Sequence, residues 1–398
     1  MGLAEQRGAL AAAPIMLASL GCLQPGIDPV FLTLLSAADA VRPADHGWIV
    51  GATQSGMAIG SVVVWRFARL APLAYPLAAF CAFLAALATV QAQSLEALLA
   101  IRATYGLAMG ITYARAMSVA AISRPNGAYG AVFLLQLLLS TLTALALTEL
   151  LRQAGARPAL AALCFVPLLS ILLSMPRFAR SLPPRLSAAP PAPAREPMQE
   201  ADAAGWAFAI ATLLFISATM MVWSFTGALA IEAGIGEGTV GLAVALGSIV
   251  GAVTAAAVMR ERTLIPPLAT GVLAGLSLLT PIAAAGSGDA TAFVIAIVLL
   301  NIGSTAIIIR CSGLASARSL TPRFRTFVTC THSLGMIIGP VIGSLASMAG
   351  GRGGLLLAAI LTIAAGCGAL LLSTLYRSGK PAFPALFRNA QKGRLTNV

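Results

Sequence analysis

Long apolar segments alternate with short polar or basic stretches along almost all of the 398 residues. A helix that crosses the ~30 Å hydrocarbon core of a bilayer needs roughly 20 mostly apolar residues. Continuous apolar runs favour helices over the alternating strands of a membrane barrel. The pattern predicts twelve spanning helices, at residues 10–36, 47–66, 71–93, 97–121, 127–151, 158–175, 206–230, 239–259, 264–285, 290–315, 326–349 and 354–376.

Composition supports an all-α integral membrane protein. Hydrophobic residues make up 59% of the chain and charged residues only 10%, whereas soluble domains carry about 25% charged residues. The first apolar segment is expected to be a retained span, because it is too long for a secretion signal and lacks a convincing cleavage site.

The distribution of basic residues predicts orientation. The net charge is +12, from 25 Lys and Arg and 13 Asp and Glu. Counting from a cytoplasmic N-terminus, eighteen basic residues fall on the inner side, four on the outer side and three inside spans. This excess predicts cytoplasmic termini in a bacterial inner membrane. The charge therefore indicates contact with anionic lipid headgroups, and no nucleic-acid partner is expected.

A polar, proline-rich stretch divides the chain into two halves. We expect a six-helix bundle over residues 1–175, a cytoplasmic linker over 176–205, a second bundle over 206–378 and a cytoplasmic tail over 379–398. Residues 105–130 and 301–326 share a pattern at an offset of 197, which pairs Pro125 with Pro322 and Gly106 with Gly303. Repeated bundles of this kind are typical of secondary transporters.

Two motifs make residues 8–378 resemble the major facilitator superfamily. The stretch "SVVVWRFAR" after the second span keeps the motif's arginines Arg66 and Arg69, but Trp65 stands where that family has an aspartate. On the fourth span, Arg102 is followed by glycines that include Gly106. The resemblance implies two pseudo-symmetric bundles and gating or structural roles for these four residues.

A third motif lies on the eleventh predicted span. The stretch "GMIIGPVIGS" contains Gly339, which allows close helix approach, and Pro340, which allows a kink. Both residues are expected to be structural. The related glycine–proline motif that drug–proton antiporters carry on the fifth span is absent from this sequence.

The strongest candidate for chemistry is Asp28, in "GCLQPGIDPVF" on the first span. A carboxylate at this depth costs several kcal/mol unless it meets water or a partner. Gln24 lies one turn earlier, and Pro25 and Pro29 remove two backbone donors. The resemblance implies that spans one, four, seven and ten line a central cavity. We therefore predict a proton-coupling or substrate-binding site at Asp28 and Gln24; the alternative is a purely structural, protonated carboxyl.

Further polar residues are weaker candidates for substrate binding or coupling. Arg115 and Arg310 would attract an anionic substrate or pair with Asp28, although Arg115 could instead reach the headgroups. His332 could carry a proton, or could be a packing residue. Trp223 and Gln136 are candidate cavity contacts.

These features predict a secondary transporter, proton-coupled and moving a small organic solute. Two buried arginines against one aspartate would favour an organic anion. The alternative is an efflux exporter of drugs, siderophores or metabolites on the same fold. The sequence has no phosphate-binding loop and no catalytic or metal-type clustering of its two histidines, so neither an enzyme nor a bound metal or cofactor is expected. A monomer is expected.

Overall fold

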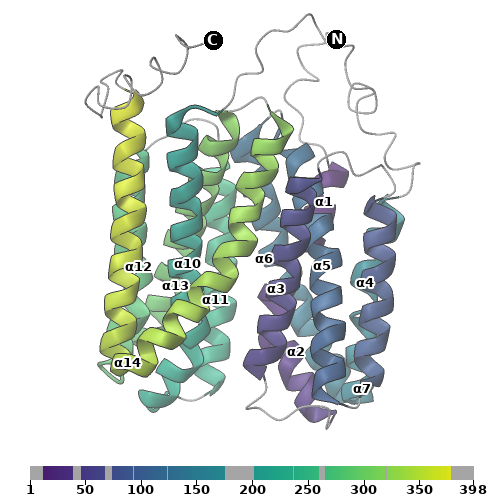
Figure 1. Cartoon of the computed structure of the whole chain (residues 1–398). Coiled ribbons are helices and arrows are strands. Elements are labelled where there is room, and N and C mark those ends of the chain that lie inside the picture. The colour runs from purple at the N-terminus through teal and green to yellow at the C-terminus, as the bar shows by residue number, and fades with distance from the viewer. Residues whose placement is uncertain are drawn as a thin grey trace, which may run out of the picture.

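The computed structural model describes residues 12–38, 46–67, 74–92, 94–122, 124–174, 201–235, 237–259, 265–318 and 321–377. Within these ranges every regular element is an α-helix (Figure 1). The helices are α1 (Ala12–Gly21), α2 (Gln24–Ala37), α3 (His46–Arg66), α4 (Ala74–Gln91), α5 (Leu95–Ala120), α6 (Pro125–Ala154), α7 (Ala156–Ala162), α8 (Phe165–Ser174), α10 (Ala203–Glu232), α11 (Glu237–Val258), α12 (Pro267–Ala285), α13 (Ala290–Ala317) and α14 (Pro322–Arg377).

The helices suit a bilayer. Among the described residues, eight helical segments are long and apolar enough to cross a membrane, and three shorter apolar helices accompany them. Large apolar side chains such as Leu142, Leu273 and Leu361 are mostly exposed along these helices. Exposure of this extent is expected where lipid replaces water. The prediction of an all-helical membrane protein is confirmed at this level.

The helices form two bundles that stand side by side. Figure 1 shows α1 to α8, coloured purple to blue, in one bundle, and α10 to α14, coloured teal to yellow, in the other. One continuous core joins the two bundles, since Tyr113 and Tyr129 belong to the same buried cluster as Phe208 and Phe293. The two bundles therefore pack against each other through buried side chains. Most of the predicted linker and the whole predicted tail lie outside the described residues.

The first predicted span is broken in two. After α1, the N–H of Cys22 donates to Ala18 O at 3.0 Å and the N–H of Leu23 donates to Leu20 O at 3.3 Å. The helix resumes at Gln24, and Pro25 has no N–H with which to continue the earlier hydrogen-bond ladder. The break thus lies directly before the segment that carries Gln24 and Asp28.

A second break divides α14. Gly350 and Gly351 have non-helical backbone angles, and Gly351 has a φ of +55°. The predicted spans 326–349 and 354–376 lie on either side of this point. The backbone angles stay helical at Pro340, so the interruption inside α14 occurs at the two glycines, where a left-handed conformation is inexpensive.

Glycines allow very close helix approaches, at Gly106 and at Gly339 among other positions. A Cβ added to Gly106 on α5 would clash with the carbonyl oxygen of Thr53 on α3. Gly56 on α3 meets Ala103 of α5 in the same way. In the other bundle, a Cβ at Gly339 would clash with the carbonyl oxygen of Ser217 on α10. These small residues let helix backbones touch.

Candidate functional site

Asp28 lies inside the first bundle. Its carboxylate oxygen Oδ1 accepts a hydrogen bond of 2.7 Å from Gln24 Nε2, and both side chains are buried, with Asp28 only 8% exposed. The two residues are four apart on α2, so they share one helix face. Gln24 and Asp28 are therefore hydrogen-bonded to each other in the structure.

Arg102 supplies positive charge to the same region. The Arg102 guanidinium is in electrostatic range of Asp28. Its central carbon lies 4.4 Å from the ring centroids of Phe31 on α2 and Tyr105 on α5. Arg102 Nε also donates a hydrogen bond of 3.2 Å to Thr53 Oγ1 on α3. We refer to Gln24, Asp28, Thr53, Arg102 and Tyr105 as the Asp28 cluster.

Polar groups in and beside the Asp28 cluster have unused hydrogen-bonding capacity. Among the described residues, Arg102 Nη2 has no hydrogen-bond partner, and the side-chain amide of Gln54 makes no hydrogen bond of ordinary geometry, although it lies close enough to Asp28 to interact with its carboxylate. Gln24, Arg102 and Tyr105 also line an internal cavity of about 10 Å³, enough for one water molecule. Buried polar groups are nearly always hydrogen-bonded, so groups beside Asp28 that lack a partner can form new hydrogen bonds when the charge on Asp28 changes.

His332 lies between the two bundles. Its Nδ1 is 3.1 Å from the Tyr113 hydroxyl of α5, and its Nε2 is 2.9 Å from the Ser312 hydroxyl of α13. The Tyr129 ring of α6 stacks on the imidazole with centroids 5.5 Å apart. His332 on α14 therefore joins helices of both halves, a position that the sequence did not reveal.

Neighbouring contacts extend this junction. The hydroxyls of Ser61 on α3 and Ser333 on α14 lie 2.9 Å apart, and Cys330 Sγ donates to Ser61 O at 3.0 Å. We call Ser61, Tyr113, Ser312, His332 and Ser333 the interhalf seam. All of them lie toward the end of the molecule where α3 finishes at Arg66 and α14 begins at Pro322, which we call the Arg66 end. The halves are therefore joined at the Arg66 end.

The remaining predicted site residues are dispersed. Arg310 is buried on α13, whereas Arg115 is half-buried on α5. Gln136 Oε1 accepts a contact of 3.4 Å from Cys22 Sγ, which ties α6 to the end of α1. Trp223 is half-buried and packs against the large core cluster. Arg102, which sequence reasoning assigned a structural role, is the arginine described next to Asp28 in this structure.

The family-like turn after α3 has an altered arrangement. Trp65 packs against Phe327 of α14 with ring centroids 5.7 Å apart, and the Arg323 guanidinium lies 5.5 Å over the Trp65 ring. An aromatic contact thus stands where the resembling family would place a carboxylate. Arg66 is exposed and lies 5.7 Å from the Phe67 ring. Arg69 lies outside the described residues.

Several members of these groups were missed by sequence reasoning. Gln54 could have been found, because an amide in the middle of an apolar span is costly and therefore informative. Thr53, Ser61 and Ser333 could not, because small hydroxyl residues are common in membrane helices and usually bond to their own backbone. Tyr113 gave no signal beside the more prominent Arg115.

Comparison with known proteins identifies the fold. No family model and no curated protein matches the sequence. The proton:xylose symporter XylE superposes with a TM-score of 0.66 at 10% identity, covering 92% of this chain and 95% of its own. A bacterial homologue of the iron transporter ferroportin, in an outward-facing state, gives 0.67 at 14% identity, covering 92% and 99%.

A third solved structure agrees with these two. The transporter FucP in its outward conformation gives a TM-score of 0.62 at 15% identity, covering 91% of this chain and 98% of its own. All three similarities extend over nearly the whole of both chains, so they include both bundles and the seam between them. The chain therefore has the fold of the major facilitator superfamily.

Proposed function

We propose that this chain is a secondary active transporter that moves a small organic solute across the bacterial inner membrane. The supporting observation is a buried carboxylate, hydrogen-bonded to Gln24 and with the Arg102 guanidinium nearby, in a fold whose solved members include a proton:xylose symporter. In this proposal the chain acts as a monomer with twelve spans. Helices α1 and α2 form one span, α7 and α8 another, and α14 provides two, divided at Gly350 and Gly351.

The proposed cycle is alternating access. Seam contacts such as Tyr113–His332 and Ser61–Ser333 close the Arg66 end, and opening this end requires them to separate. The excess of basic residues places the Arg66 end at the cytoplasm. The described arrangement is then the one closed to the cytoplasm, and rocking of one bundle against the other would open it.

Asp28 is the proposed proton site. With Asp28 ionised, its charge balances that of Arg102; with Asp28 protonated, the cluster carries a net charge of +1. Because the cluster is buried, this change must be accommodated by rearranged hydrogen bonds, and Gln54 and Arg102 Nη2 have the free capacity to make them. Proton binding would thereby change which arrangement of the bundle is preferred.

Asp28→Asn tests this assignment. The purified protein is first screened for stabilisation by organic acids, amines and sugars, since a ligand that binds the folded state raises Tm. In proteoliposomes, Asp28→Asn should abolish accumulation driven by a pH gradient while substrate exchange continues. Glu149→Gln is the matched control, because Glu149 is an exposed carboxylate paired with Arg152 at 2.6 Å. Full accumulation by Asp28→Asn would remove Asp28 from the coupling role.

We further propose an organic anion as the solute. Arg310 is buried on α13 and Arg115 half-buried on α5, and guanidinium groups bind a carboxylate through paired, charge-assisted hydrogen bonds. Arg310→Gln should then weaken the stabilisation by organic acids at least about tenfold in concentration, and leave stabilisation by any neutral ligand unchanged. Comparison of whole-cell uptake with susceptibility assays separates import from export of drugs or metabolites.

A further inference from the structure

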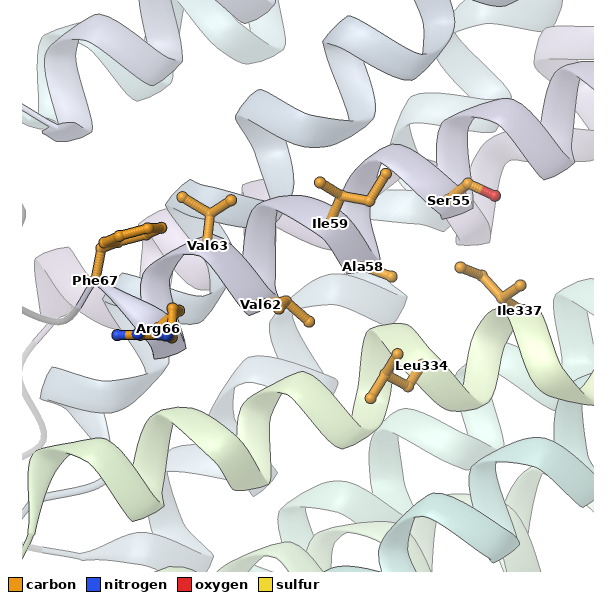
Figure 2. Close-up of a pocket in the computed structure, with 9 residues that line it drawn as sticks. All are labelled: Ser55, Ala58, Ile59, Val62, Val63, Arg66, Phe67, Leu334 and Ile337. Atoms are coloured by element: carbon orange, nitrogen blue, oxygen red, sulfur yellow. The ribbon is translucent and has the colours of Figure 1, made fainter.

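A groove runs between α3 and α14 on the surface of the molecule, across the junction of the two halves. Its volume is about 420 Å³. Figure 2 shows Ala58 and Val62 of α3 pointing toward Leu334 and Ile337 of α14, with Ile59 on the outer side of α3. Ile59 is 55% exposed, so the groove opens outward.

The groove is apolar except at its two ends. Ser55 lies at one end and Arg66 at the other, as Figure 2 shows. The eleven residue steps between them span about 16 Å along a helix. One leaflet of the hydrocarbon core is about 15 Å deep, half of the total. The groove therefore has the length and the lining that suit one acyl chain from a single leaflet.

The positive charge at one end of the groove indicates which kind of lipid headgroup would bind there. Arg66 is the last residue of α3 and is exposed, so its guanidinium stands where the helix leaves the hydrocarbon. Guanidinium groups bind phosphate through paired, charge-assisted hydrogen bonds. An acyl chain in the groove would bring its own phosphate to Arg66.

The groove exists because the two halves meet. The Ser61–Ser333 and Cys330–Ser61 contacts hold α3 beside α14 directly along its wall. Separation of the halves at the Arg66 end would take Leu334 and Ile337 away from Ile59 and remove the groove. A ligand that occupies it therefore binds this arrangement better than the open one.

We propose that the groove binds an anionic phospholipid, with one acyl chain between α3 and α14 and the phosphate at Arg66, and that this lipid favours the arrangement closed at the Arg66 end. The proposal goes beyond solute transport, and its test requires neither a substrate nor a proton gradient. A failure of the Asp28 assignment would leave it unaffected.

Two measurements test it on the delipidated full chain in mild detergent. Phosphatidylglycerol should raise Tm in a saturable way, and phosphatidylcholine with the same acyl chains should not. The second measurement is the maleimide labelling rate of Cys330 in a variant that keeps it as the one cysteine, because Cys330 is buried at the seam. Phosphatidylglycerol should slow this labelling by at least about fivefold, within the usual range of coupling between sites.

Three variants make the test specific. Arg66→Gln should abolish both effects of phosphatidylglycerol. Arg323→Gln is the matched control, since Arg323 is an exposed arginine at the same end but does not line the groove, and it should keep both effects. Ile59→Trp fills the groove from an exposed position and should abolish both effects while leaving the headgroup contact in place.

Several outcomes would overturn the proposal. Equal stabilisation by phosphatidylcholine would show that Arg66 selects no headgroup. Equal losses in Arg66→Gln and Arg323→Gln would indicate diffuse surface charge instead of a site. Stabilisation by inorganic phosphate alone would show that the groove takes no part, as would a full phosphatidylglycerol response in Ile59→Trp.

Discussion

Gly106→Ala tests the packing that holds the Asp28 cluster together. The added Cβ would clash with the carbonyl oxygen of Thr53 and would also lie 2.9 Å from its carbonyl carbon and 3.1 Å from Met57 N. These are backbone atoms of α3, so they cannot rotate away as a flexible side chain would. Helices α3 and α5 must move apart at the residue that accepts the Arg102 hydrogen bond.

The expected cost follows from these contacts. Overpacking of a tight interface costs about 1–3 kcal/mol, and the helix propensity of alanine over glycine returns up to about 1 kcal/mol. At about 2.1 cal/mol/K of unfolding entropy per residue, each kcal/mol lowers the Tm of this chain by about 1 °C. We expect a decrease of about 1–2 °C in detergent, together with reduced gradient-driven accumulation because the Arg102–Thr53 bond is stretched.

Gly51→Ala is the control for this prediction. Gly51 also lies on α3 and is exposed, and a Cβ added there would meet no atom within 4 Å. The same substitution at this position should leave Tm unchanged or slightly higher. Thermal unfolding of the three proteins at one scan rate compares them directly. A Gly106→Ala protein as stable as Gly51→Ala, with normal accumulation, would refute the close-packing argument.

Three more predictions follow from individual contacts. His332→Ala leaves the Tyr113 and Ser312 hydroxyls without their shared partner, which should destabilise the closed arrangement by about 1–3 kcal/mol. Maleimide should then label Cys330 several-fold faster, and an unchanged labelling rate would contradict a closing role for His332. Arg102→Lys loses the planar cation–π contact with Phe31 and Tyr105, which is worth about 0.5–2 kcal/mol, so solute accumulation and Tm should both fall. Wild-type values for both would disprove a packing role for the Arg102 guanidinium. Gly351→Ala forces alanine to a φ of +55° and should lower the free energy of unfolding by about 1–2 kcal/mol, whereas Gly350→Ala, at a φ of −153°, should be tolerated. Equal Tm values for the two variants would contradict this prediction.

The pattern of apolar residues was sufficient for the class of fold, because lipid imposes a local condition. Each spanning helix must hydrogen-bond its own backbone groups and present apolar side chains to the lipid. The position of a helix can therefore be predicted from about 20 consecutive residues. The close helix approach expected at Gly339 depends on the same kind of local pattern, a small residue within an apolar helix. The cost of a buried charge singled out Asp28 in the same local way, whereas Arg102 was assigned a gating or structural role by the family resemblance.

The partners of these residues depended on tertiary structure. Sequence reasoning offered Arg115 and Arg310 for Asp28, and the structure brings Arg102 into its electrostatic range, because the rotation of α5 relative to α2 is set by helix packing. The position of His332 between Tyr113 and Ser312 follows from the meeting of two bundles that lie far apart in sequence. The groove at Arg66 arises in the same way, since most of its wall comes from α3 and the rest from Leu334 and Ile337 of α14, on the other side of that junction.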